Sequence, residues 1–151
     1  MLQRIQSMFL FIILGISVSD LFVPLAIFEK KNVYELFCLN VIDTGTGQVQ
    51  EFISFPLLIV MAVIVLITVI TIFSYKNRPR QIKFCKLNIL MNFVFIVVLF
   101  YFADEFEKLS GANAQYTIGA FLPLASVVLL FLTNRSVKKD EELVKSADRL
   151  R

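Results

Sequence analysis

Four long runs of apolar residues, separated by polar connections, dominate the pattern of the chain. They extend over about residues 5–28, 52–75, 87–103 and 116–134. A helix needs roughly 20 mainly apolar residues to cross the hydrocarbon core of a bilayer. The second run is rich in β-branched residues, but an open strand in lipid would leave its backbone groups unpaired, so a helix is favoured. The pattern therefore predicts an all-α membrane protein, a single domain over residues 1–151 with four transmembrane helices.

The first run has a second interpretation, because it begins like a secretory signal peptide with small residues at Ser17 and Ser19 for cleavage. Two features argue against cleavage. The segment before the run has one basic residue, Arg4, and apolar sequence resumes after Asp20. We therefore expect a retained helix over about residues 5–28 that is interrupted by Asp20.

Composition and the placement of charge agree with this class of protein. Hydrophobic residues make up 58% of the chain, against about 45–50% in soluble domains. Arg4, the connection 76–86 and the tail 135–151 hold twelve of the fifteen Lys and Arg residues. Because basic residues gather on the cytoplasmic side, we expect both termini, and the tail 135–151, to be cytoplasmic. The protein is expected to cross the membrane several times.

The connection from Glu29 to Glu51 is the one sizeable region expected outside the membrane. Two short runs of β-forming residues flank a Thr-Gly-Thr-Gly turn at 44–47. That arrangement predicts a short extracytoplasmic hairpin-like loop. An isolated hairpin is marginal in water, so this one is expected to pack on the helix ends or on a partner.

Three polar residues in the apolar runs are candidate functional residues. Asp20 is the first, since an acid inside a span points to function. Sixteen residues separate it from Arg4, so it falls near the outer edge of the core, where it is either hydrated, paired with Lys30 or Lys31, or part of an ion or substrate site. Asn88 and Asn92 are expected to face the threonines of the second run. They predict hydrogen bonds between helices, with a polar permeation path as the alternative.

The tail has helical periodicity. Leu143, Ala147 and Leu150 recur at spacings of four and three residues, so a helix would place them on one face. Such a short helix is marginal alone in water. It is therefore expected to continue from the fourth span or to lay its apolar face on something: the basic connection 76–86, the lipid surface, or the groove of a membrane or cytoplasmic protein partner.

Several classes of function lack support in the residues. The chain has no His, which is the usual acid–base group near neutral pH and the commonest metal ligand. Cys38 and Cys85 are expected on opposite sides of the membrane and so cannot pair. No catalytic, cofactor-binding or metal-binding pattern is present, and the basic connection is too short for a nucleic-acid module. We therefore expect neither an enzyme nor a cofactor, and as partners the lipid bilayer and protein, without nucleic acid.

Both ends of the chain resemble a known family. Residues 1–6, Met-Leu-Gln-Arg-Ile-Gln, and residues 146–151, Ser-Ala-Asp-Arg-Leu-Arg, are similar to the ends of an uncharacterised family of four-helix inner-membrane proteins from Bacteroidota, domain of unknown function 4293. The resemblance implies an inner-membrane location in such a bacterium and no activity. The expected function is a non-enzymatic accessory or assembly subunit of a membrane complex, with a small oligomeric carrier or channel for an ion, lipid or metabolite as the alternative.

Overall fold

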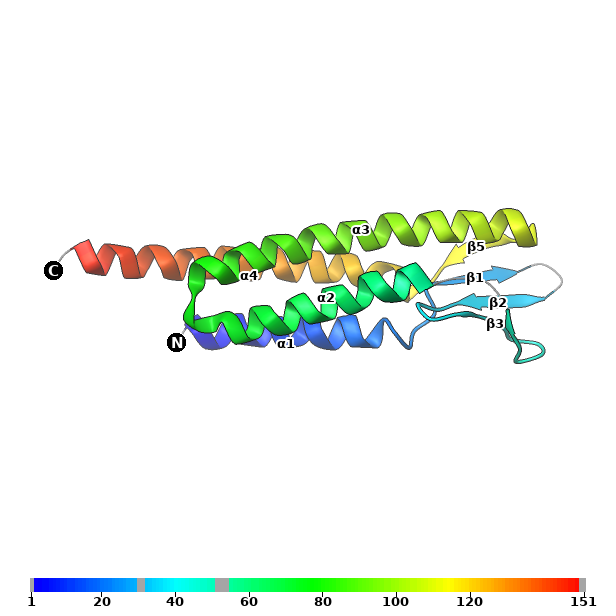
Figure 1. Ribbon diagram of the computed structural model, residues 1–151, viewed down its shortest axis with the longest axis horizontal. Helices are drawn as coiled ribbons and strands as arrows, with labels where there is room; N and C mark the ends of the chain where they lie inside the picture. The colour runs from blue at the N-terminus through cyan, green and yellow to red at the C-terminus, as the bar shows by residue number, and fades with distance from the viewer. Residues whose placement is uncertain (1, 30–31, 51–54, 150–151) are drawn as a thin grey trace.

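The computed structural model describes residues 2–29, 32–50 and 55–149. Within them lie four α-helices and a small sheet (Figure 1). The helices are α1 (Leu2–Ser19), α2 (Phe55–Phe73), α3 (Arg78–Ser110) and α4 (Ile118–Arg149), and a 3-10 turn, η1 (Ser74–Lys76), follows α2. α1 packs against α2 and α4, and α3 also packs against α2 and α4. The helices therefore form a four-helix bundle.

Helix length separates the parts that can cross a membrane from the parts that project. α2, α3 and the segment Ile118–Leu143 of α4 are long and apolar enough to span a bilayer, whereas the described apolar stretch of α1, Ser7–Ser19, is shorter. α3 has 33 residues and α4 has 32, which gives each a length of about 50 Å against a core of about 30 Å. The protein is thus a multi-pass membrane protein, and α3 and α4 extend past opposite ends of the bundle (Figure 1).

At the end of the bundle away from the α2–α3 connection, an antiparallel sheet has the strand order β4-β3-β2-β1-β5. Its strands are β1 (Ala26–Glu29), β2 (Val33–Leu36), β3 (Val41–Asp43), β4 (Val49–Gln50) and β5 (Asn113–Tyr116). β1 lies between β2 and β5, since Ala26 pairs with Leu36 on one side and with Tyr116 on the other. The sheet therefore joins segments that are about ninety residues apart in the sequence.

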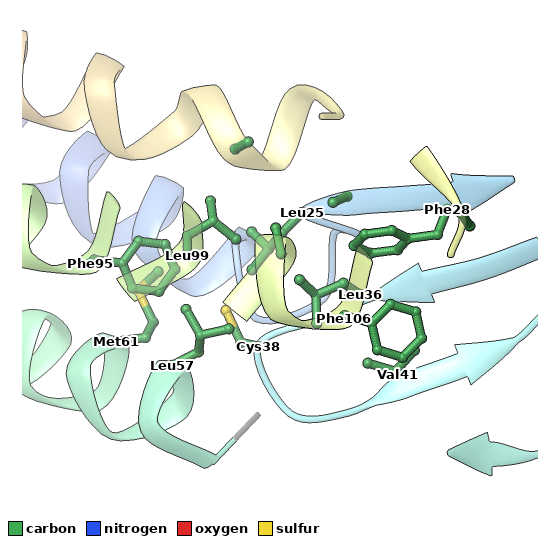
Figure 2. Close-up of a cluster of buried hydrophobic side chains, with 14 of the residues drawn as sticks. Leu25, Phe28, Leu36, Cys38, Val41, Leu57, Met61, Phe95, Leu99 and Phe106 are labelled. Atoms are coloured by element: carbon green, nitrogen blue, oxygen red, sulfur yellow. The ribbon is translucent and has the colours of Figure 1, made fainter. Parts of the chain in front are cut away.

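The projecting end of α3 packs against the sheet. The ring of Phe106 lies 4.7 Å from that of Phe28 and 5.7 Å from that of Tyr34, both in edge-to-face geometry. One buried cluster continues from this contact down into the bundle, where Leu57 of α2 and Leu99 of α3 join it (Figure 2). Sheet and bundle consequently share one hydrophobic core, which meets the expectation that the outer strands need a surface to pack on.

The expected first span of residues 5–28 is wrong in its second half. α1 ends at Ser19, and Ala26–Glu29 is a strand. Pro24 cannot donate a backbone hydrogen bond, which disfavours a helix through this point. The segment 21–28 is apolar because Leu25, Ala26 and Phe28 are buried in the protein core, not because it crosses lipid.

The expectation of an all-α protein with a hairpin-like loop is therefore met only in part. The Thr-Gly-Thr-Gly turn does connect two paired strands, β3 and β4, with Gly47 at a φ of 66°. However, the run before this turn is itself folded into two strands, because the chain reverses between Phe37 and Asn40. The predicted bounds of the last three spans lie within or close to α2, α3 and α4, and the tail is helical as far as Arg149.

Candidate functional site

Asp20 lies one residue beyond the end of α1, at the level where the bundle meets the sheet. Its side chain is only 1% exposed, and Oδ1 has no hydrogen-bond partner within the described part of the chain. The backbone carbonyl of Asp20 accepts a hydrogen bond from the Cys38 thiol at 3.3 Å. The side chain is thus buried rather than hydrated, while Lys30 and Lys31, its other expected partners, fall outside the described residues.

Burial changes the proton affinity of both groups at this junction. It raises the pKa of the Asp20 carboxyl to about 7, because the charged form is desolvated. Burial, and then the charge of Asp20, raise the pKa of the Cys38 thiol to about 12. Cys38 therefore stays protonated near neutral pH, where a thiolate would be needed for nucleophilic chemistry. Within the described ranges no group of three or more His, Cys, Asp or Glu side chains could hold a metal ion.

Asn88 and Asn92 form a hydrogen-bonded link between α2 and α3. Asn88 Nδ2 donates to Thr68 Oγ1 at 2.7 Å, and Asn92 Nδ2 donates to the Asn88 carbonyl and to Asn88 Oδ1 at 2.9 and 3.0 Å. The Thr68 hydroxyl in turn donates to the Ile64 carbonyl. All three side chains are buried. This arrangement fits a link between helices better than a permeation path.

The tail is a direct continuation of the fourth span. Val137 and Asp140 remain buried against the bundle, whereas Leu143 is 51% exposed. Figure 1 shows the red end of α4 continuing past the α2–α3 connection. Of the other two expected contact residues, the Ala147 side chain and Leu150 lie outside the described residues. The exposed part of the predicted apolar stripe is therefore seen at Leu143.

Sequence reasoning missed a hollow beside α4, at the base of the tail. It has a volume of about 580 Å³, and its described lining consists of Phe131, Asn134, Arg135, Lys138, Lys139 and Glu142. The sequence predicts the cytoplasmic side and a general attraction to anionic headgroups from the basic residues of the tail, but no hollow. Their spacing from Phe131, at four and seven residues, was the signal that they share a helix face with it.

A second hollow, of about 400 Å³, lies at the other end of the bundle. Its lining is mainly apolar and includes Phe22, Leu39 and Leu58. Phe22 and Leu39 are both exposed. Apolar side chains here lie beside the outer part of α2, so this surface suits contact with lipid chains rather than with a polar ligand.

Comparison with known proteins gives a family and no activity. The sequence profile of the family described as domain of unknown function (DUF4293) matches residues 2–150. No curated protein matches the chain.

Proposed function

This chain belongs to the DUF4293 family, a domain of unknown function, and we propose that it is a non-enzymatic accessory or assembly subunit of a complex in the bacterial inner membrane. In this proposal the helical bundle anchors the protein, with both termini in the cytoplasm. The tail of α4 then binds a protein partner.

One observation carries the proposal: α4 is an uninterrupted helix from Ile118 to Arg149. A separate helix of the tail's length would be marginal in water because its first turn is costly to form. Continuity with the span removes that cost and holds the exposed Leu143 at a set distance from the bundle. An amphipathic helix presented in this way suits the groove of a partner protein.

The charges of the tail support a protein partner over a lipid surface. Beyond its base, residues 140–151 contain Lys145, Arg149 and Arg151, but also Asp140, Glu141, Glu142 and Asp148. Anionic lipid prefers a uniformly basic face. Mixed charge around an apolar stripe instead resembles the polar rim of a protein interface.

The test is co-purification from native membranes in mild detergent, quantified by mass spectrometry. Leu143→Asp with Leu150→Asp should leave abundance and insertion unchanged and reduce the recovery of a stoichiometric cytoplasmic partner by at least tenfold. Glu142→Gln, which alters the charge next to the stripe and leaves the stripe intact, is the matched control and should retain the partner. Full recovery with the double variant would show that the tail is only a solvated extension.

A second candidate function, a small oligomeric carrier or channel, is favoured by the buried Asp20 carboxyl, whose Oδ1 has no partner within residues 2–29, 32–50 and 55–149. The filled interior of the monomer weighs against it, since Ile13, Leu130 and Phe95 are fully or almost fully buried in the bundle. Proteoliposomes loaded with a pH-sensitive or cation-sensitive dye would separate the two. Flux that depends on the protein and is lost in Asp20→Asn would favour the carrier.

A further inference from the structure

The hollow beside α4 lies where the last apolar run gives way to charged sequence. From Ile118 to Asn134 the helix has no charged residue, and Arg135 is the first cation. The hollow extends over this boundary, since its described lining begins at Phe131 and ends at Glu142. Its position is therefore that of a membrane–water interface, at the end of the bundle opposite the sheet.

Along the helix the lining passes from an apolar residue to basic residues. The acyl chains and the phosphate of a phospholipid follow one another in the same order. Phe131 is 64% exposed and lies on the apolar side, and Arg135 and Lys138 follow on the same helix face. Seven residues of helix separate Phe131 from Lys138, a rise of about 10 Å. The headgroup region of one leaflet is about 5–8 Å deep, so this rise carries the helix face from the acyl chains through the level of the headgroups. Phe131 can thus contact acyl chains while the two cations reach the phosphate.

The charge of the hollow favours an anionic ligand over a zwitterionic one. Arg135, Lys138 and Lys139 supply three positive charges, and Glu142, at the far end, supplies one negative charge. Arginine binds phosphate oxygens in a bidentate manner, and lysine adds a point charge. A headgroup with a net negative charge gains from all three cations, whereas an ammonium group would be repelled by them.

Asn134 adds a specific feature inside this hollow. Its side chain is 8% exposed, and Oδ1 has no hydrogen-bond partner in the described part of the chain. A buried acceptor without a donor costs free energy. Oδ1 is itself shielded in this structure, so a ligand hydroxyl satisfies it when the Asn134 side chain turns toward the hollow. Phosphate oxygens alone would not satisfy it, because they are acceptors as well.

From these observations we infer that the hollow of Phe131, Asn134, Arg135 and Lys138 is a binding site for an anionic phospholipid with a hydroxylated headgroup, such as phosphatidylglycerol. The phosphate lies at Arg135 and Lys138, and a glycerol hydroxyl donates to Asn134 Oδ1. The inference does not depend on the proposed docking of the tail. It assigns a lipid to the base of the tail, between the span and the projecting part of α4.

The experiment titrates the purified full-length protein in detergent with short-chain phosphatidylglycerol, with bound lipid measured by native mass spectrometry. Arg135→Gln with Lys138→Gln should raise the Kd about 25-fold, from about fivefold for each cation, which is equivalent to about 1 kcal/mol each. Lys83→Gln with Lys86→Gln removes the same charge from exposed positions of α3 outside the hollow and should change the Kd less than twofold. An equal rise in Kd for both double variants would show that the lipid is held by general attraction to the charged surface, and would overturn the inference.

Ligand comparisons with the wild-type protein avoid any effect of substitution on folding. Phosphatidylglycerol should bind at least tenfold more tightly than phosphatidylcholine or phosphatidylethanolamine, and more tightly than phosphatidylmethanol, which has the charge without the hydroxyl. Asn134→Leu should abolish the preference over phosphatidylmethanol. Equal binding of phosphatidylcholine, or displacement of the lipid by equimolar soluble glycerol phosphate, would contradict a lipid headgroup site.

Discussion

At the scale of single residues, Asp20 has a buried carboxyl whose Oδ1 has no hydrogen-bond partner among the described residues. Asp20 follows the last residue of α1, so the partial negative charge at the end of that helix also disfavours its ionised form. Cys38, the titratable group in contact with it, is itself held in the protonated form. The environment of Asp20 therefore favours the neutral acid over the carboxylate.

The raised pKa predicts that stability depends on pH in a definite direction. Between the ordinary pKa of 3.8 and the folded-state pKa of about 7, the folded protein holds a proton that the unfolded chain has lost. Stability should thus fall as pH rises through this window, by up to about 1.4 kcal/mol per pH unit, and level off above it. The apparent Tm in detergent from pH 5 to pH 8 measures this.

Asp20→Asn keeps the shape of the side chain and removes its titration. The variant should have a higher apparent Tm than the wild type at pH 8 and a flatter pH profile, while Asp104→Asn, at an exposed position, should follow the wild-type profile. A flat wild-type profile would show that water reaches the carboxyl.

At the scale of elements, the start of α4 packs against the segment that links α1 to β1. Thr117 Oγ1 donates to the Pro24 carbonyl, and the Thr117 N–H donates to the Leu25 carbonyl at 3.1 Å. At Gly119 an added Cβ would lie 2.5 Å from the carbonyl oxygen of Pro24. Only glycine allows this approach of helix and backbone.

Two glycines in helices therefore predict opposite outcomes for the same substitution. Gly119→Ala should destabilise the protein by about 1–3 kcal/mol, because the backbone of Pro24 must move. Gly15→Ala in α1, where an added Cβ meets nothing within 4 Å, should stabilise it by about 0.5–1 kcal/mol through helix propensity. Unfolding of both variants in detergent and denaturant gives the comparison, and a loss of stability of similar size in both would contradict the close contact at Gly119.

At the scale of the whole molecule, the placement of the two ends relative to the membrane stays a prediction. The wild-type cysteines cannot report it, because Cys38 and Cys85 are both buried, and neither should react with a maleimide in the folded protein. Thr46 in the β3–β4 turn and Arg80 near the start of α3 are exposed. They lie at opposite ends of the bundle and can report the orientation in place of the native thiols.

If both termini are cytoplasmic, Thr46→Cys should react with an impermeant maleimide in intact cells, and Arg80→Cys only after the membrane is permeabilised. The unmodified protein is the control for labelling of the native thiols. The reverse pattern would invert the topology and, with it, the side on which the tail and the lipid site lie.

The helical part of the fold could be predicted from the sequence because its cause is local. Residues 52–75, 87–103 and 116–134 are long enough and apolar enough that lipid leaves the backbone no alternative to a helix. The spacing of Asn88 and Asn92 across a short connection from Thr68 similarly placed them at one depth, and the hydrogen bond from Asn88 to Thr68 confirms the contact.

Tertiary structure alone decided where the sheet forms and what it buries, since an apolar sequence does not distinguish burial in lipid from burial in protein. Residues 21–28 were predicted to continue the first span, but β1 forms there because Ala26 and Phe28 pair with β2 and with β5, which is distant in sequence. The same packing buries Asp20 and covers Cys38. The hollow beside α4 was also missed, because the spacing of its residues places them on one helix face but does not show that this face is left open when the helices pack. Pairings between distant segments, and the cavities they leave, depend on the assembled molecule, whereas the spans depend only on their own residues and the bilayer.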